Sequence, residues 1–156
     1  MTAPAGAPLE GVRVLEFGQI AAAPFCGALL GDLGADVVKI ERRGEGDGMR
    51  QWPPLMGDAD GERFSGNFAS VNRNKRSIAV DLRSPEDREG ILELVRRADV
   101  VLENFRPGAL DKLGLGYEDL AAHNPKIVYC SFSGYGQQGP YARHGAFDVT
   151  VQRSAG

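Results

Sequence analysis

The chain has 156 residues, of which 42% are hydrophobic and 25% are charged, and its formal net charge is −3. These are ordinary values for a soluble globular domain, and they give no reason to expect a nucleic-acid or anionic-membrane partner. The most apolar stretch, residues 20–33, is interrupted by proline, glycine and aspartate and is too short to cross a bilayer. We therefore expect a cytoplasmic protein without a membrane segment, in which Cys26 and Cys130 are reduced thiols.

Residues 12–41 have the pattern of a β-α-β unit. Apolar, β-branched runs predict buried strands at residues 12–17 and 36–41. Between them, Pro24 suits the first turn of a helix, and Gly34 is placed to end that helix in the left-handed conformation. One apolar helix face is predicted from the spacing of Ala22, Phe25, Cys26, Leu29, Leu30 and Leu33.

The same alternation continues after an insertion. Residues 42–72 are rich in glycine, proline and charge, and they predict loop with at most short helices. Further strands are predicted at residues 77–82, 99–103 and 127–132, and helices at residues 85–98, near 108–113, near 117–122 and at the end of the chain. Ser84 is the expected N-cap of the first of these helices. The alternation predicts an α/β fold, a Rossmann-like parallel sheet with helices on both faces.

Ligands of such sheets bind beyond the carboxyl ends of the strands. Arginine, amide and glycine residues dominate these ends in the chain, at residues 18–22, 42–44, 83, 104–108 and 133–136. They suit an anionic ligand that carries phosphate. The first of these loops, FGQIAAAP, lacks the G-x-G-x-x-G pattern, so a classical NAD site is not expected. The chain also lacks a G-x-S-x-G nucleophile motif and a metal-ligand cluster at a recognisable spacing.

Five segments carry a resemblance to a known family. They are, in chain order, PLEGVRVLEFGQIAAAPFCGALLGDLGADVVKIERRGEGD, NRNKRSIAVDL, ADVVLENFRPGALDKLGLGYEDL, NPKIVYCSFSGYGQQGPY and GAFDVTVQRSAG. This series resembles the amino-terminal part of the family III CoA-transferases over nearly the whole chain. The family also includes formyl-CoA transferase, the carnitine-CoA transferases and the α-methylacyl-CoA racemases.

The resemblance implies that residues 9–156 are the amino-terminal part of a CoA-binding large domain, which follows a loose tail at residues 1–8. Members of the family have a second, smaller domain, and two of their chains interlock as linked rings. We therefore expect a fragment of a longer protein that forms a homodimer. The implied activity moves CoA between an acyl-CoA thioester and a carboxylic acid, with coenzyme A as substrate and product and with no separate cofactor or metal.

The resemblance also implies the residues of the site. The positions that match the CoA contacts of the family are Ala21, Ala22, Arg42, Val80, Asp81, Leu82, Arg83, Asn104, Phe105, Arg106 and Lys112. The positions that match its contacts beside the thioester are Gly145, Ala146, Phe147 and Asp148. The cations of this set can neutralise the 3′-phosphate and the pyrophosphate of CoA, and Val80 and Leu82 can flank the adenine. The alternative interpretation is that these cations are solvated surface residues.

The family's transfer reaction needs an aspartate that attacks the thioester and forms a mixed anhydride. The resemblance puts that aspartate downstream of the match at residues 145–156, so we assign no catalytic residue and interpret Asp148 as a supporting one. Ala21 stands where formyl-CoA transferase has a glutamine, and Phe147 stands where the racemases have the histidine that exchanges the α-proton. Both departures disfavour those activities. A racemase and a truncated, non-catalytic CoA-binding remnant are the alternatives.

Overall fold

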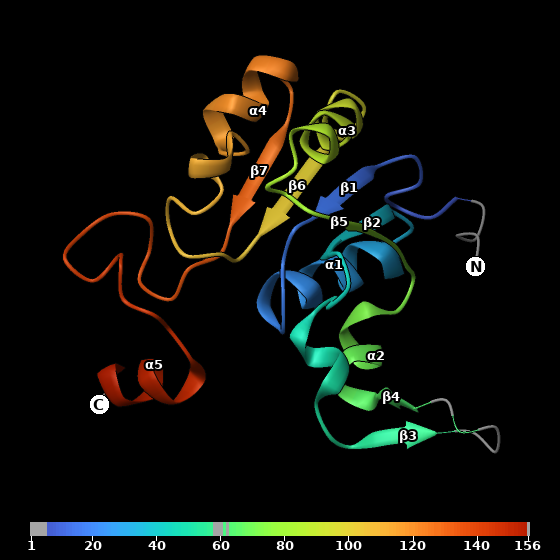
Figure 1. Cartoon of the computed structure of the whole chain (residues 1–156), viewed down its shortest axis with the longest axis vertical. Helices are drawn as coiled ribbons and strands as arrows, with labels where there is room; N and C mark the ends of the chain where they lie inside the picture. Colours follow the sequence, from blue (N-terminus) through green and yellow to red (C-terminus); the bar gives the residue numbers. More distant parts are fainter. Residues whose placement is uncertain (1–5, 58–60, 62, 156) are drawn as a thin grey trace.

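The computed structural model describes residues 6–57, 61 and 63–155 (Figure 1). Its main sheet has five parallel strands in the order β5-β2-β1-β6-β7. The strands are β1 (Arg13–Glu16), β2 (Asp36–Arg42), β5 (Lys75–Val80), β6 (Val100–Glu103) and β7 (Val128–Ser131). This is the order of a doubly wound sheet, in which the winding reverses between two neighbouring strands, here β1 and β6. The predicted fold class is confirmed.

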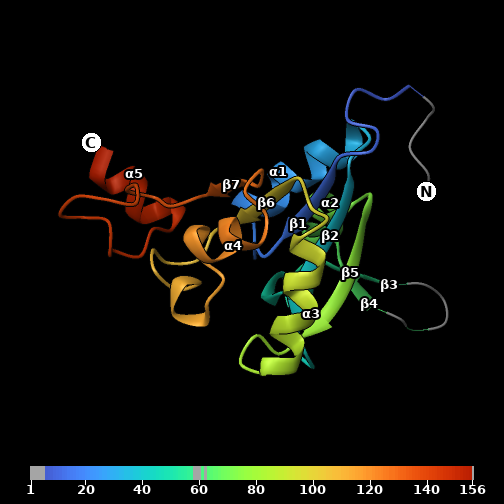
Figure 2. The same ribbon diagram turned by 90° about the horizontal axis from the view of Figure 1, so that it is seen from above.

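Helices cover both faces of this sheet (Figures 1 and 2). Helix α1 (Ala22–Asp32) lies on one face, and α3 (Pro85–Val95), the 3-10 helix η2 (Asp111–Leu113) and α4 (Tyr117–His123) lie on the other. Helix α2 (Gly66–Asn72) packs beside α1. Successive residues of a strand point to opposite faces. Accordingly, Val14 belongs to the core under α1, whereas Leu15 and Phe17 belong to the larger core under α3 and α4. The predicted Ser84 cap is present, since its hydroxyl accepts the N–H of Asp87.

The insertion at residues 42–72 contains more structure than we predicted. It has a 3-10 helix, η1 (Gly48–Gln51), an antiparallel hairpin of β3 (Leu55–Gly57) and β4 (Arg63–Ser65), and then α2. The hairpin extends away from the main sheet (Figure 1). The loop prediction was wrong here because strands of three residues are too short to show a period of two.

The amino- and carboxyl-terminal segments lie outside the sheet. Residues 1–5 of the predicted tail are outside the described residues, and the N–H of Leu9 already donates to the carbonyl of Leu33 at 2.9 Å. After β7, a long segment leads to the predicted final helix, α5 (Asp148–Ala155), which stands apart from the sheet in both views (Figures 1 and 2). Within the described part of the chain, no helix is long and apolar enough to span a membrane.

Helix α1 packs on the sheet mainly through small residues, and only Cys26 and Leu30 of the apolar face that we predicted pack against the core. Ala23, Pro24, Gly27 and Ala28 are buried, whereas the side chains of Phe25, Leu29 and Leu33 are 52%, 44% and 46% exposed. A β-carbon on Gly27 would lie only 2.0 Å from Oε2 of Glu16, on the strand below. The small residues therefore let the helix approach the sheet closely, and Phe25, Leu29 and Leu33 remain on its outer side.

We expect Gly27→Ala to destabilise the protein by about 2 kcal/mol or more, because the added methyl group overlaps a buried carboxylate. Gly90→Ala, within α3, is the matched control, since a β-carbon there meets nothing within 4 Å. Helix propensity should make that control neutral or stabilising by up to about 1 kcal/mol. Urea unfolding of both variants measures the difference, and equal stabilities would contradict the close packing over Glu16.

Candidate active site

A pocket of about 540 Å³ opens at the carboxyl edge of the main sheet. Its lining residues follow or end strands β1, β2, β5 and β6, and they are Phe17, Gln19, Ile40, Glu41, Arg42, Arg43, Glu45, Val80, Asp81, Leu82, Arg83, Phe105 and Leu113. The volume is that of a small-molecule site. Apolar side chains form part of the wall and arginines stand among the charged residues, so the pocket suits a ligand with both an apolar ring and anionic groups.

The arginines of this pocket are accessible to a ligand. Nη1 of Arg42 lies 2.8 Å from Oε2 of Glu45, and both side chains are exposed. Arg43, also exposed, pairs with Asp87, whose side chain is partly buried. Ion pairs between exposed side chains are worth little and exchange readily. Among the described residues, none forms an ion pair or hydrogen bond with the guanidinium of Arg83, so it can take an anionic partner without breaking a contact.

Glu41, in contrast, is buried and fully engaged. Its carboxylate accepts two hydrogen bonds from Arg50, at 2.7 and 2.6 Å, one from Ser77 at 2.6 Å and one from the N–H of Asp47 at 2.9 Å. Burial raises the pKa of the Glu41 carboxyl, but the hydrogen bonds from Arg50, Ser77 and Asp47 outweigh that effect and hold the pKa at about 2. An acid at this strand end binds a ribose in dinucleotide folds, and here its oxygens are already occupied.

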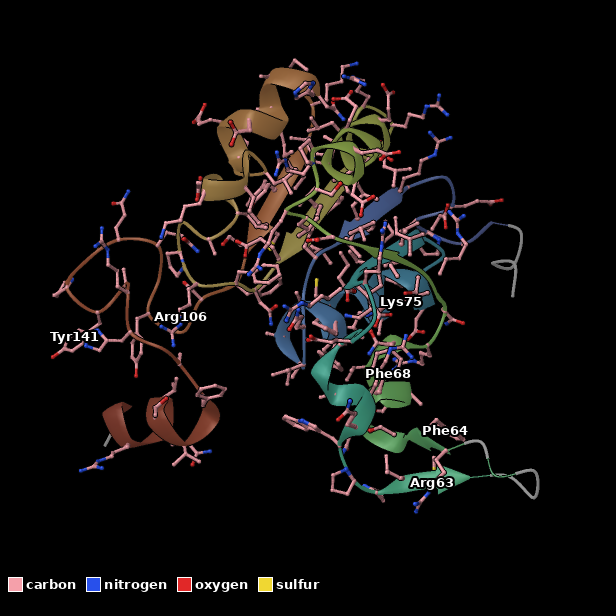
Figure 3. The ribbon with its side chains drawn as sticks, viewed as in Figure 1. Arg63, Phe64, Phe68, Lys75, Arg106 and Tyr141 are labelled. Atoms are coloured by element: carbon pink, nitrogen blue, oxygen red, sulfur yellow. The ribbon has the colours of Figure 1, made fainter. Side chains whose placement is uncertain are left out.

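A cluster of buried charges lies under α1, beside the pocket. Nζ of Lys39 is 3.0 Å from both Oε1 of Glu16 and Oδ2 of Asp47, and Nζ of Lys75 is 2.7 Å from Oε2 of Glu16. Lys75 also donates to the carbonyl of Pro24 in α1 at 2.7 Å (Figure 3). Burial lowers the pKa of Lys75 more than the charge of Glu16 raises it. The sequence signal for this cluster was a charged residue within each of two apolar strands.

The structure brings six of the predicted CoA contacts together in the pocket. They are Arg42, Val80, Asp81, Leu82, Arg83 and Phe105. Ala21 and Ala22 are exposed at the start of α1, and Lys112 is exposed in η2. The Asn104 amide holds the backbone of Gln19 through two hydrogen bonds of 2.8 Å, so it supports the pocket from behind. Gln19 and Arg43 also line the pocket, and they belong to the strand-end segments 18–22 and 42–44 that we expected to suit an anionic ligand. Glu45 was not predicted, because only the packing of neighbouring loops puts it in the wall.

The predicted contacts near the carboxyl terminus lie apart from this pocket. Arg106 faces that segment, since a β-carbon on Gly145 would lie 3.2 Å from its Nη2 atom (Figure 3). Ala146 packs against Gly134, whose absent side chain makes room for it. The side chain of Phe147 is 69% exposed, and Asp148 is the first residue of α5. Among the described residues, this segment contributes nothing to the pocket lining.

A second pocket, of about 390 Å³, lies beside the first at the ends of β6 and β7. It is lined by Glu103, Gly108, Leu110, Asp111, Tyr117, Tyr129, Ser131 and Gln137. Burial raises the pKa of the Glu103 carboxyl, which accepts hydrogen bonds from the Ser131 hydroxyl and the N–H of Phe105. With two acids and no cation among its described lining residues, this pocket does not suit a phosphate. The described residues also contain no group of side chains that could hold a metal ion.

A doubly wound sheet with a pocket at its carboxyl edge defines an α/β protein of the nucleotide-binding type. The model of CoA-transferase family III matches residues 9–156, and the chain belongs to this family. It is 48% identical over 151 residues to the succinate–glutarate CoA-transferase of Agrobacterium fabrum. It is also 45% identical over 150 residues to the human succinyl-CoA:glutarate CoA-transferase. These matches include 96% of the chain but only 38% and 33% of the two relatives, so the chain spans about a third of their length.

Solved structures agree with this assignment. A CAIB/BAIF family protein from Brucella suis superposes with a TM-score of 0.89 at 49% identity, over 95% of this chain and 39% of that one. A putative betaketoacyl-ACP reductase superposes with a TM-score of 0.50 at 16% identity, which shows a common fold alone. The first loop of the chain, FGQIAAAP, lacks the G-x-G-x-x-G pattern of a classical dinucleotide site.

We expect the stability of the protein to fall as the pH decreases from 4.5 to 2, partly through Glu41. The folded-state pKa of about 2 is below the ordinary value of 4.5. The carboxylate therefore stabilises the fold above pH 4.5, and this contribution is lost as the pH falls through the folded-state pKa. Urea unfolding between pH 7 and 2 should show the stability gap between wild type and Glu41→Gln closing by about 2 to 3 kcal/mol.

The control for this experiment is Asp36→Asn, which removes an exposed ion pair with Arg76. We expect that variant to differ from wild type by less than about 1 kcal/mol at every pH. If the free energy of unfolding of Glu41→Gln had the same pH dependence as that of wild type, the low folded-state pKa of Glu41 would be contradicted.

Proposed function

We propose that this chain supplies the CoA-binding edge of a CoA-transferase, which moves CoA between an acyl-CoA thioester and a carboxylic acid. The observation that carries the proposal is the arginine-bearing, partly apolar pocket at the carboxyl edge of the sheet, in a member of CoA-transferase family III. CoA combines an aromatic adenine with a 3′-phosphate and a pyrophosphate. The apolar lining residues match the adenine, and the arginines match the phosphates.

In this proposal the contacts divide by chemistry. Val80 and Leu82, which lie in and just after β5 in the pocket wall, flank the adenine. Arg42 and Arg83 bind the phosphates, because guanidinium groups form strong, paired hydrogen bonds with phosphate oxygens. The unpaired N–H groups in the first turn of α1, near Ala21 and Ala22, add a partial positive charge at the same edge of the sheet.

The proposed chemistry uses a carboxylate nucleophile. An aspartate oxygen attacks the thioester carbonyl, the carbon–sulfur bond breaks, and CoA leaves as a thiolate, so that a mixed anhydride remains on the enzyme. Glu41 does not suit this role, because its oxygens are occupied by Arg50, Ser77 and Asp47. The family resemblance assigns the nucleophile to a residue after the segment at 145–156, and the same resemblance suggests a cytoplasmic, interlocked homodimer.

The relatives suggest the class of substrates. Their names pair succinyl-CoA or succinate with glutarate, mesaconate or D-citramalate, all of them carboxylic acids with more than one carboxylate. We propose that the acceptor is a small acid of this kind. Racemase activity is not favoured, because Phe147 has no group that could exchange a proton.

Calorimetric titration with CoA tests the binding part of the proposal. We expect wild type to bind CoA, and Arg83→Ala to raise the Kd about tenfold through the loss of charged hydrogen bonds. Arg76→Ala is the control, because this exposed arginine stands near the opposite end of β5 and pairs with Asp36. Titration with dephospho-CoA, which lacks the 3′-phosphate, shows which phosphate Arg83 binds. If Arg83 binds the 3′-phosphate, Arg83→Ala should not change the Kd for dephospho-CoA. Absence of CoA binding to wild type would contradict the proposal.

An activity assay on the whole protein, including any sequence beyond these residues, tests the reaction. We expect succinyl-CoA and glutarate to give glutaryl-CoA, and hydroxylamine to trap an acyl-enzyme as a hydroxamate. Solvent deuterium at the α-carbon of a branched acyl-CoA, without CoA transfer, would identify a racemase instead. CoA binding without either reaction would identify a non-catalytic CoA-binding protein.

A further inference from the structure

Asp47 joins the two loops that border the pocket. It lies between β2 and η1, it is 1% exposed, and it is not among the pocket-lining residues. Its carboxylate accepts the N–H of Ile20, at 3.2 and 3.1 Å to the two oxygens, and the N–H of Met49 at 2.9 Å. Ile20 belongs to the loop between β1 and α1, whereas Met49 belongs to the segment after β2. One buried side chain therefore anchors both loops.

The first of these loops has a backbone conformation that requires an anchor. Ile20 has a φ of 64°, in the left-handed region that a β-branched residue rarely adopts. Such a conformation is unfavourable for a β-branched residue and persists only where its surroundings hold it. The hydrogen bonds to Asp47 are the contacts that hold the N–H of Ile20 in place.

Three consecutive residues of this loop are held by side chains from elsewhere in the chain. Lys39 donates to the carbonyl of Gly18 at 2.7 Å, and Asn104 holds both backbone groups of Gln19. Asp47 holds Ile20 and is itself paired with Lys39 at 3.0 Å. Because Gln19 lines the pocket, these anchors determine where the first loop stands in the pocket wall.

Asp47 also shapes the second loop. Its own N–H donates to Oε2 of Glu41 at 2.9 Å, which closes the turn that carries Arg42, Arg43 and Glu45. These three residues line the pocket on the side of β2. Movement of Asp47 would therefore change the distance between Gln19 on one side of the pocket and the arginines on the other.

We propose that Asp47 is a positioning residue for the anionic ligand of the pocket, although it does not contact that ligand. It keeps Ile20 in its left-handed conformation and fixes the two bordering loops relative to each other. This inference rests on the proposed function in one respect: CoA is the ligand used to measure it.

The test compares Asp47→Ala with Asp99→Asn. Asp99 is the matched control, since its carboxylate accepts a single backbone N–H, that of Arg13 at 2.8 Å, at the opposite end of β1. We expect Asp47→Ala to raise the Kd for CoA about tenfold and to accelerate amide hydrogen exchange at Ile20 about tenfold, with Asp99→Asn unchanged in both measurements. Asp47→Leu keeps the branched shape of the side chain but has no acceptor for the N–H of Ile20, and it replaces the alanine variant if that variant does not fold cooperatively in urea.

A second substitution separates positioning from general stability. Glycine adopts positive φ without strain. Ile20→Gly therefore removes the backbone strain that would open the loop once the hydrogen bonds to Asp47 are lost. The double variant Ile20→Gly/Asp47→Ala should bind CoA at least about threefold more tightly than Asp47→Ala. If Asp47→Ala weakened binding only by destabilising the whole protein, Ile20→Gly would not restore the affinity.

The two proposals fail in different ways. If wild type binds CoA and the Asp47 variant binds it within about twofold of wild type, the positioning role is overturned and the proposed function stands. If wild type does not bind CoA, the proposed function fails, and the exchange rate at Ile20 still decides the role of Asp47. Unchanged exchange at Ile20 in the variant overturns that role in either case.

Discussion

The ion pair between Glu16 and Lys39 is the constraint on which the rest of the structure depends. The two residues are register neighbours on β1 and β2, they are 0% and 1% exposed, and their charged atoms lie 3.0 Å apart. Removing one partner of such a pair leaves an uncompensated buried charge, which typically costs about 3 to 5 kcal/mol. The pair therefore requires further partners, and Lys75 and Asp47 provide them from other segments of the chain.

This requirement links the packing of α1 to the geometry of the pocket. Over Glu16 the helix has a glycine, so it lies close to the sheet with its small residues inward and its large ones outward. At the other end of the cluster, Lys39 and Asp47 hold the loop between β1 and α1. In dinucleotide-binding folds, glycines in this loop allow the backbone to approach a pyrophosphate. Here buried charges hold the loop instead, while the exposed arginines provide the cations.

Hydrophobic periodicity predicted the helices and strands that are long enough to show a repeating pattern. The five strands and the helices from Pro85, from Tyr117 and near the end of the chain lie within a few residues of their predicted bounds. The hairpin at residues 55–65 was missed because its strands are short. The face of α1 was predicted correctly for Cys26 and Leu30 but wrongly for the exposed Phe25, Leu29 and Leu33, because spacing identifies apolar residues but not the partner on which the helix packs. Six of the implied CoA contacts share a pocket, because parallel strands bring their carboxyl ends to one edge.

The sequence by itself determined the fold class, the edge of the sheet where a ligand pocket forms, and the family. These follow from local patterns, since strand and helix periods, caps and the order of the five family-like segments can be read without knowing any long-range contact. Tertiary structure alone decided that Glu16, Lys39, Lys75 and Asp47 meet, and that Glu41 is occupied by Arg50. The physical reason is that a buried charge is stable only beside its partner. These partners are 8 to 59 residues apart in the sequence, and only the folded chain brings them within hydrogen-bonding distance.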